Sequence, residues 1–418
     1  MRGRGWMRLV LLRAVLTAVV GLGMSCGWAQ TKLATVPLKQ FGAMTAGELD
    51  QQHPIPNPPP DRVGWTTSGP SGGIAWQGVG AVAVDGKGHV YVGLPIWASG
   101  YAPKNAVRGQ GDKLRVLVVN AAGKGAVERT MDFPTKSLGR VDLRLAGDGT
   151  LLVLADDKLM RVGGDGKPTA ELKVPNEEKE YEVWDVESSA TGRTLRLRLN
   201  EEHTLLVDAE TLTVLKQCHG SKDVDEEGTM TDDLELASRV ETTEPKLTYG
   251  LERKGFCEKR ERLGEFGDID FVPSVLDDAQ FLAIARTGIA LRKLSGETVW
   301  TTKAPAGRVL GKWEGEERLS QDGRRVAMRL FKEMQYHEPD TMNPEDIRNG
   351  TWNRVKTVEV QASIGVWDVA SGRLVGQAPL PAGDASNYTS ANAQFGLSPD
   401  GRTLAVVQDG VLTVWRME

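Results

Sequence analysis

A short motif that recurs along the chain constrains the fold more than any other feature of the sequence. Two copies match closely, Leu319-Ser-Gln-Asp-Gly-Arg-Arg-Val-Ala-Met and Leu397-Ser-Pro-Asp-Gly-Arg-Thr-Leu-Ala-Val. Each copy has the pattern of a strand end, an Asp-Gly turn and a second, apolar strand. Asp-Gly is typical of type I′ hairpin turns, whose central residues need positive φ. The sequence therefore predicts repeated β-hairpins.

The spacing of this motif predicts a ring of small sheets. Looser copies place turns near positions 88, 149, 192 and 279, before the clear ones at 323 and 401. Two of the gaps are 43 and 44 residues, and the gap of 87 is twice that length, so a degenerate repeat is expected around residues 240–257. The gaps of 61 and 78 residues fit one period plus an insertion. Repeats of about 40–45 residues with four short strands are typical of β-propellers. Six visible turns and one hidden turn predict about seven blades.

The two ends of the chain are expected to meet in one blade. Third strands are expected at residues 158–162, 204–208, 288–292, 363–368 and 410–415. Because the chain ends just after the last of these, the final blade lacks a fourth strand. Residues 35–41 are expected to supply it and close the ring. The proline-rich segment 54–60 then reads as a stiff linker to the first blade.

The C-terminal hundred residues resemble a known family. Val366-Trp-Asp-Val-Ala-Ser-Gly-Arg-Leu-Val, followed by Phe395-Gly-Leu-Ser-Pro-Asp-Gly-Arg, is similar to WD40-type repeats. The match is clear over residues 319–418 and faint elsewhere, and the chain lacks a Gly-His dipeptide at the start of each blade. The earlier blades also resemble NHL and quinoprotein-type propellers. The resemblance implies an all-β fold, namely a single β-propeller of about seven four-stranded blades. Such relatives share architecture and not chemistry.

The N-terminus has the three parts of a secretory signal peptide. Arg2, Arg4 and Arg8 give a basic start, residues 9–22 are nearly all apolar, and Gly27-Trp-Ala precedes a cut after residue 29. The expected organisation is a signal peptide at 1–29, a ring-closing strand and linker at 30–67, and the propeller at 68–418. The mature protein is then periplasmic or secreted. The alternative is a lipoprotein anchored at Cys26, which the lack of a leucine three places earlier disfavours.

The net charge bears on the binding partners of the protein, and the cysteine count bears on its disulfide bonding. The formal net charge of −5 disfavours nucleic acid, since phosphate-binding domains usually present a basic face. No segment after the signal peptide is apolar enough to cross a membrane, and a monomer is expected. Once the signal peptide is removed, only Cys218 and Cys257 remain, and an even pair in an exported protein predicts a disulfide. Two unpaired buried thiols are the alternative.

Three departures from the minimal blade are the candidate binding segments, because long loops in compact domains are often functional. Residues 94–111 carry Trp97 and Tyr101, and residues 332–356 carry a second set, which comprises Tyr336, His337, Asp340 and Trp352. Residues 223–235 are acidic and begin like a calcium loop. They lack the bidentate glutamate that an EF-hand needs at position twelve, so a solvated loop is favoured over a Ca²⁺ site. No other cofactor is predicted.

No catalytic motif stands out in the sequence. The chain has five histidines and no His-Glu-x-x-His, Gly-x-Ser-x-Gly or Walker pattern. The favoured interpretation is an exported, non-catalytic scaffold that binds a protein or a glycan. The alternative is a metal-dependent propeller hydrolase or lyase acting on a sugar, lactone or ester. A quinone-dependent dehydrogenase is a third, weaker hypothesis that depends on Gly296-Glu-Thr-Val-Trp.

Overall fold

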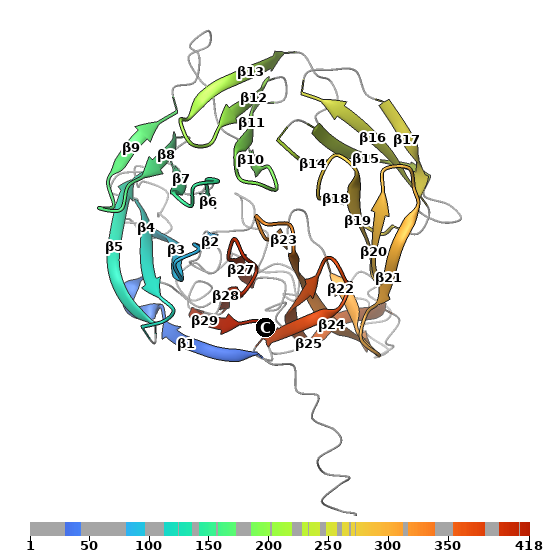
Figure 1. Cartoon of the computed structure of the whole chain (residues 1–418). Helices are drawn as coiled ribbons and strands as arrows, with labels where there is room; N and C mark the ends of the chain where they lie inside the picture. The colour runs from blue at the N-terminus through green and yellow to red at the C-terminus, as the bar shows by residue number, and fades with distance from the viewer. Residues whose placement is uncertain are drawn as a thin grey trace, which may run out of the picture.

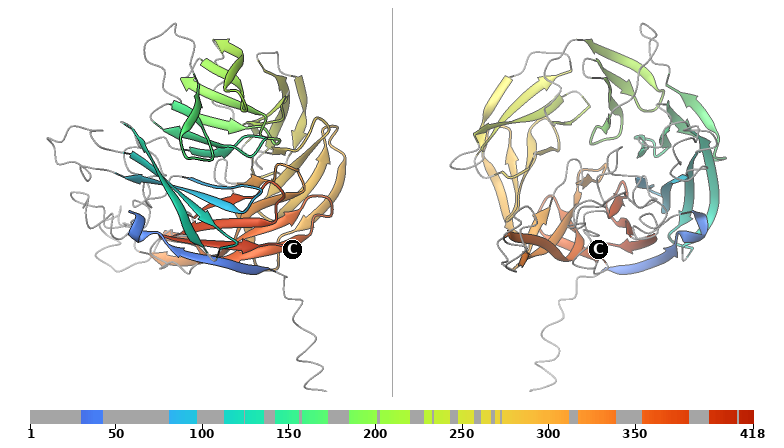
Figure 2. Two further views of the ribbon diagram at one scale, coloured as in Figure 1. Left: turned by 60° about the vertical axis from the view of Figure 1, so that its left-hand side comes forward. Right: turned by 180° about the vertical axis from the view of Figure 1, so that it is seen from behind.

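Seven antiparallel sheets stand around a common axis, so the chain is a single all-β propeller (Figure 1). The structure is a computed structural model. It describes residues 30–42, 81–96, 113–123, 125–135, 142–155, 158–172, 185–200, 203–219, 228–232, 234–242, 248–256, 261–266, 269–271, 273–311, 317–338, 354–380, 393–408 and 410–418. Within these residues the number of sheets matches the number of blades that the turn spacing predicts. The view from behind shows the same ring (Figure 2).

The first three blades each contain four consecutive strands. Blade 1 holds β2 (Ala81–Val84), β3 (His89–Ile96), β4 (Lys113–Asn120) and β5 (Ala126–Pro134). Blade 2 holds β6 (Asp142–Leu145), β7 (Leu151–Ala155), β8 (Lys158–Val162) and β9 (Pro168–Glu171). Blade 3 holds β10 (Asp185–Ser188), β11 (Thr194–Asn200), β12 (His203–Asp208) and β13 (Thr213–His219).

The remaining blades follow the same plan. Blade 4 holds β14 (Gly228–Met230), β15 (Leu234–Thr242), β16 (Thr248–Gly255) and β17 (Glu261–Phe266). Blade 5 holds β18 (Ser274–Val275), β19 (Gln280–Ala285), β20 (Gly288–Lys293) and β21 (Thr298–Lys303). Blade 6 has a first strand in two pieces and holds β22 (Val309–Gly311), β23 (Arg318–Leu319), β24 (Arg325–Glu338), β25 (Arg354–Asp368) and β26 (Leu374–Pro379). Blade 7 holds β27 (Gln394–Leu397), β28 (Thr403–Gln408) and β29 (Val411–Arg416), completed by β1 (Thr31–Pro37).

The N-terminal strand closes the ring, as expected. β1 pairs antiparallel with β29 along its length, and the two strands lie side by side in blue and red (Figure 1). The strand begins at Thr31, earlier than the predicted residues 35–41, and Lys39–Phe41 instead form a 3-10 turn, η1. Ala34, Val36 and Leu38 are buried in the core between blades 7 and 1. Burial of each larger side chain contributes about 1.5–3 kcal/mol, which holds the two ends of the chain together.

The repeated turns differ from the predicted type I′. At the blade 6 turn only Gly323 has positive φ, 69°, and Asp322 does not. The turn has four residues and is closed by a hydrogen bond from Gly323 N to Ser320 O. The Asp322 carboxylate accepts hydrogen bonds from Ser320 Oγ at 2.6 Å and from Arg324 N at 3.0 Å. The role of the aspartate is therefore to accept hydrogen bonds within the turn. Only the glycine position has a backbone conformation that favours glycine.

The hidden repeat is blade 4, and its first turn lies earlier than predicted. β15 and β16 fall within the expected region of residues 240–257 or next to it, but the turn between the first and second strands lies at residues 231–233. That turn reads Thr231-Asp-Asp and lacks glycine. Part of the acidic segment interpreted as a loop is therefore the start of a blade.

Apolar side chains fill the space between neighbouring blades. Six clusters of buried residues lie between blades 7 and 1, 1 and 2, 2 and 3, 4 and 5, 5 and 6, and 6 and 7. At the junction of blades 3 and 4, hydrogen bonds from Ser189 and Thr191 to Asp232 join the two blades. The strand order makes the first strand of each blade the edge that faces the axis.

The second long insertion is largely a strand extension. Residues 332–356 were expected to form a loop, but β24 continues to Glu338 and β25 starts at Arg354. The two strands pair from Arg325↔Asp368 out to Glu338↔Arg354. A bulge occurs between Leu330 and Lys332, where Gln361 on β25 has a positive φ of 52°. On the β25 side the insertion carries the β-branched residues Val355, Thr357, Val358 and Val360, and such residues favour strands.

Strand direction gives the ring two unlike faces. First-to-second and third-to-fourth turns lie on one face, here called the turn face. Second-to-third connections and blade-to-blade connections leave from the opposite face, here called the loop face. The connection after β3, the connection between β24 and β25, and the acidic connection before β14 all leave from the loop face. The first two candidate segments and the start of the acidic one therefore leave from one face, whereas Asp232 of the acidic segment lies in a turn on the opposite face.

Candidate binding site in the central channel

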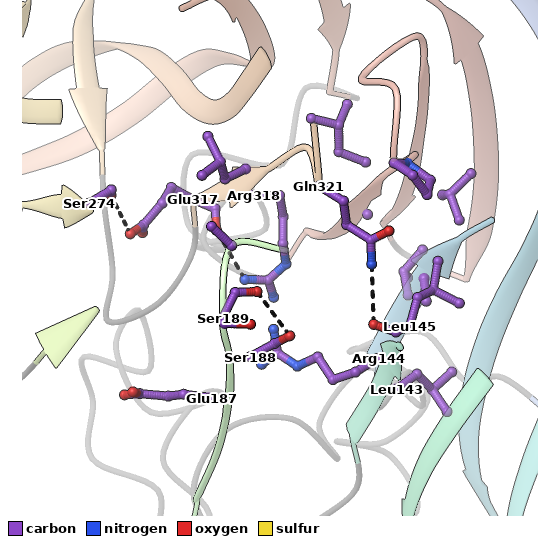
Figure 3. Close-up of a pocket in the computed structure, with 18 of the residues that line it drawn as sticks. Leu143, Arg144, Leu145, Glu187, Ser188, Ser189, Ser274, Glu317, Arg318 and Gln321 are labelled. Atoms are coloured by element: carbon purple, nitrogen blue, oxygen red, sulfur yellow. Dashed lines mark hydrogen bonds between the residues drawn. The ribbon is translucent and has the colours of Figure 1, made fainter. Parts of the chain in front are cut away.

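A cavity of about 250 Å³ lies at the middle of the ring (Figure 3). The first strands β2, β6, β10, β18, β23 and β27 form its wall, together with the turn residues that follow some of them. Its polar side chains come from the inner strands and turns of four of the seven blades and are Arg144, Glu187, Ser188, Ser189, Ser274, Glu317, Arg318 and Gln321. Because Ser189, Ala190, Gln321 and Pro399 belong to turns, the cavity lies toward the turn face.

Each arginine of the cavity is held by a neighbour. Arg144 Nε lies 2.8 Å from Asp142 Oδ2, and its guanidinium also donates to Val186 O on blade 3 at 3.3 Å. Arg318 donates to Glu317 O at 3.2 Å, and its guanidinium lies 5.8 Å from the ring centroid of Phe395. The guanidinium groups of Arg144 and Arg318 come from blades on different sides of the axis, and both residues line the same cavity.

The carboxylates of the cavity are also engaged. Glu187 forms an ion pair with Arg196, which is 5% exposed. Glu317 Oε1 accepts a hydrogen bond from Ser274 Oγ at 2.7 Å, which links blade 6 to blade 5. These contacts offset the charges of the cavity within the chain. The cavity is therefore polar without a strong net charge.

Gln321 spans the channel. It sits in the blade 6 turn, and its Nε2 donates to Leu145 O at 3.3 Å and Ala146 O at 3.4 Å, both in blade 2 (Figure 3). Blades 6 and 2 are separated by two blades in the ring, so the contact crosses the axis. Gln321 therefore narrows the channel at the level of the turns.

The turns around the cavity also bind one another. Gly147 N donates to Gly192 O at 2.8 Å between blades 2 and 3, and Asp322 N donates to Pro399 O at 3.1 Å between blades 6 and 7. Thr231 Oγ1 of blade 4 donates to the Asp278 carboxylate of blade 5 at 3.2 Å. These links fix the positions of the first strands, and hence the shape of the cavity.

One carboxylate acts across a blade boundary. Asp232 of blade 4 accepts hydrogen bonds from Ser189 Oγ at 2.6 Å and from Thr191 Oγ1 at 2.7 Å, both in the blade 3 turn. In the blade 7 turn, Ser398 Oγ instead donates to Asp400 of the same turn at 2.7 Å. The blade 3 turn has Thr191 where the turns of blades 6 and 7 have Asp322 and Asp400, so blade 4 supplies the missing carboxylate.

Two turn carboxylates, Asp400 and Asp368, have their pKa lowered by their surroundings. Burial alone would raise the pKa of Asp400. Hydrogen bonds from Ser398 Oγ and Arg402 N, with the charge of Arg402, together hold that pKa below its usual value. The Asp368 carboxyl behaves similarly, because hydrogen bonds from Ser371 outweigh the effect of burial on its pKa. These groups are structural acceptors rather than proton carriers.

A second polar cluster lies on blade 1. The buried Asp85 carboxylate accepts from His89 N and lies 2.8 Å from His89 Nδ1 and 3.2 Å from Tyr91 Oη. His89 Nε2 lies 3.5 Å from Glu128 Oε2. Burial, and next the Asp85 charge, raise the pKa of Tyr91 above its usual value. The cluster ties the β2–β3 turn to β5, which agrees with a structural role for His89.

Of the six residues predicted to bind a ligand, only two lie within the described part of the chain. Trp97, Tyr101, Asp340 and Trp352 lie outside the described residues. Tyr336 and His337 lie on β24, opposite Lys356 and Val355 of β25, and not on a loop. The residues of the cavity were missed, since first strands of two to four residues carry no periodic pattern that marks them.

Only one cysteine of the predicted disulfide lies within the described residues. Cys218 lies on β13 and is disulfide-bonded, whereas Cys257 lies outside the described residues, so their pairing stays a prediction. Within the described part of the chain, no group of three or more His, Cys, Asp or Glu is arranged to hold a metal ion. The same part of the chain contains no helix of the length and apolarity needed to span a bilayer. Residues 1–29 and Cys26 also lie outside it.

Comparisons with known proteins find similarity only among solved structures. No protein-family description matches the chain, and no curated sequence matches it. Among solved structures, the chain is similar to the β-propeller domain of Cps50 (Swd1) from Myceliophteria thermophila. That match has 13% identity and a TM-score of 0.45, and it covers 81% of this chain and 96% of that one. The propeller assignment rests on the seven sheets and their closure by β1.

Proposed function

We propose that the protein is an exported, non-catalytic binding scaffold that holds part of a ligand in the cavity of its central channel. The observation that carries this proposal is the state of the cavity's polar side chains. Every one of them named above is already held by a hydrogen bond or ion pair within the chain. A site organised in this way loses little side-chain freedom when a ligand enters, which favours binding.

The size of the cavity indicates what enters it. About 250 Å³ is less than the roughly 300–1,000 Å³ of pockets that hold whole drug-sized molecules. The cavity suits one protruding group of a larger ligand, such as a protein side chain or a terminal sugar. Serine hydroxyls, guanidinium groups and carboxylates around it offer both donors and acceptors to such a group. A protein or a glycan therefore remains the proposed ligand.

Export is supported by the sequence of residues 1–29. A basic start, an apolar stretch and small residues before position 30 are the parts of a signal peptide. Cell fractionation and N-terminal sequencing would test this: we expect a periplasmic or secreted protein that begins at Gln30. A cytoplasmic protein that retains Met1 would contradict export. A mature protein that begins with a lipid-modified Cys26 would support the anchored alternative.

A cavity-filling variant tests the binding site. Ala190 lines the cavity, and Ala190→Trp adds an indole ring to it, whereas Ala306 is exposed in the turn after β21. The mature protein and both variants would be applied to glycan arrays and peptide libraries. We expect a ligand that binds the wild type and Ala306→Trp and is lost with Ala190→Trp. Equal binding by all three proteins would exclude the cavity as the site.

The metal-dependent hydrolase remains the alternative prediction. It would be favoured if the purified protein released product from sugar, lactone or ester substrates and lost that activity with a chelator. The same result would overturn the non-catalytic scaffold.

A further inference from the structure

The extended hairpin of blade 6 has a strand edge that its own sheet leaves unpaired. β22 pairs with β24 only from Arg329 to Phe331, and β24 then continues seven residues farther to Glu338. Among the described residues, no strand pairs with the side of β24 that faces away from β25 over residues 332–338. Here this stretch, Lys332-Glu-Met-Gln-Tyr-His-Glu, is called the edge segment.

The hydrogen-bonding groups of this edge can be assigned. Leu310 N donates to Arg286 O rather than to β24, so Leu310↔Leu330 is a pair without ladder hydrogen bonds. The flanking pairs at Arg329 and Phe331 are then the hydrogen-bonded ones, because the two kinds of pair alternate. The one extra residue of the bulge lies on β25, so β24 keeps its alternation. Residues 333, 335 and 337 therefore direct their backbone N–H and C=O groups away from β25.

The edge segment is complementary to itself when it is paired antiparallel. A twofold axis at Gln335 places Lys332 opposite Glu338 of a second copy, and Glu333 opposite His337. It also places Met334 opposite Tyr336, and Gln335 opposite Gln335. Every charged residue meets an opposite or titratable partner, and the two apolar residues meet each other. Identical strands that pair about a twofold axis need a residue on that axis to keep the hydrogen-bonding groups in phase, and Gln335 satisfies this need.

We propose that two copies of this chain associate by antiparallel pairing of their edge segments about a twofold axis at Gln335. The proposal goes beyond the binding function and replaces the sequence-based expectation of a monomer. Natural proteins usually blunt long edge strands with proline, charged side chains or bulges, because such edges invite pairing. The edge segment contains no proline, and its charged residues disfavour an unrelated edge but are complementary to those of a second copy. Addition of a strand at such an edge is a common mode of association.

The contacts at the base of the hairpin are compatible with this pairing. Glu333 forms an ion pair with Arg286 of blade 5, and its side chain stays 36% exposed. A carboxylate can accept several hydrogen bonds, so Glu333 can contact Arg286 and a second copy together. The ion pair also steadies the base of the hairpin.

A charge exchange tests the proposed register. The purified full chain would be studied by analytical ultracentrifugation over its soluble concentration range, and we expect a dimer. Lys332→Glu and Glu338→Lys each place two like-charged pairs in the twofold interface and should weaken dimerisation at least about tenfold. The double variant Lys332→Glu/Glu338→Lys restores opposite charges and should restore the dimer. A monomeric wild type, or a dimer indifferent to both single changes, would overturn the proposal.

An introduced thiol gives a second test that does not depend on tolerance of charge changes. Directly opposite residues in a hydrogen-bonded antiparallel pair have Cα atoms about 5.5 Å apart, a separation that a disulfide spans. Gln335→Cys should therefore give a covalent dimer under mild oxidation. Thr357→Cys is the matched control, because Thr357 lies opposite Gln335 on β25, away from the edge. A covalent dimer from the control variant, none from Gln335→Cys, or a crosslink from Gln335→Cys to a different protein would each reject self-pairing.

Discussion

Replacement of Asp232 with alanine should show how much one carboxylate contributes to the join between blades 3 and 4. Ser189, which is 4% exposed, donates to Asp232 at 2.6 Å, and Thr191 donates at 2.7 Å from a more exposed position. A hydrogen bond to a charged group contributes about 1.5–3 kcal/mol, and the exposed one adds less. Thr194 Oγ1 lies 3.4 Å away and adds little. We therefore expect Asp232→Ala to lower the free energy of unfolding by about 2–3 kcal/mol.

The assay is chemical denaturation followed by tryptophan fluorescence, combined with a rescue that moves the carboxylate. Thr191 occupies the position that Asp322 and Asp400 hold in the other turns. Thr191→Asp in the Asp232→Ala background should therefore recover about half of the lost stability, since Ser189 regains a carboxylate acceptor within its own turn. Thr191→Asp alone places two carboxylates together and should destabilise. An Asp232→Ala protein within about 0.5 kcal/mol of wild type, or the absence of rescue, would refute the assignment of this contact.

Three further predictions concern other parts of the ring. The Arg115 hydrogen bond, with Lys113, lowers the pKa of Asp132 to about 2, so its contribution to stability is present above about pH 4 and lost as the pH falls toward 2. Because the Asp132 side chain is about one-third exposed, solvent screening limits its contribution to the free energy of unfolding to about 1 kcal/mol. Asp132→Asn should therefore make the free energy of unfolding depend less on pH between about pH 4 and 2. Gln361→Gly should raise the free energy of unfolding by about 1 kcal/mol in denaturant titrations, since Gln361 is exposed and has a left-handed φ; a loss of stability would contradict this. Val36→Asp should lower the melting temperature markedly and expose the ring to proteolysis, because it buries an unpaired charge where β1 closes the ring; unchanged protease resistance would argue against closure by β1.

The propeller could be predicted because its turns need residues that are visible in one sequence. Gly323 and Gly401 stand at positive φ, and the aspartates before them bind the turn, so the Asp-Gly pairs recur at blade spacing. The mistake about turn type arose because Asp-Gly suits two turns, and sequence alone does not show which residue carries the positive φ. Blade 4 was hard to place since its turn at residues 231–233 has no glycine.

The candidate site could not be predicted for a different reason. The first strands that line the cavity are short, and their neighbours lie in other blades, far away along the chain. The contact between Gln321 and Leu145 joins residues 176 positions apart. Asp232 was assigned to an acidic loop because nothing near it in sequence shows that its partners are Ser189 and Thr191. When a side chain contacts another blade, the residues next to it in sequence do not reveal its partner.

The two faces of the ring keep the two proposals separate. The cavity lies toward the turn face, where Gln321 and the bonded turns shape it, whereas the edge segment rises from the loop face at the far end of β24. Two copies joined at their edge segments therefore leave both cavities outside the interface. A Lys332→Glu variant that becomes monomeric should keep one ligand per chain with unchanged affinity. If ligand binding instead failed together with dimerisation, the ligand would have to contact the loop face, and the cavity would not be its site.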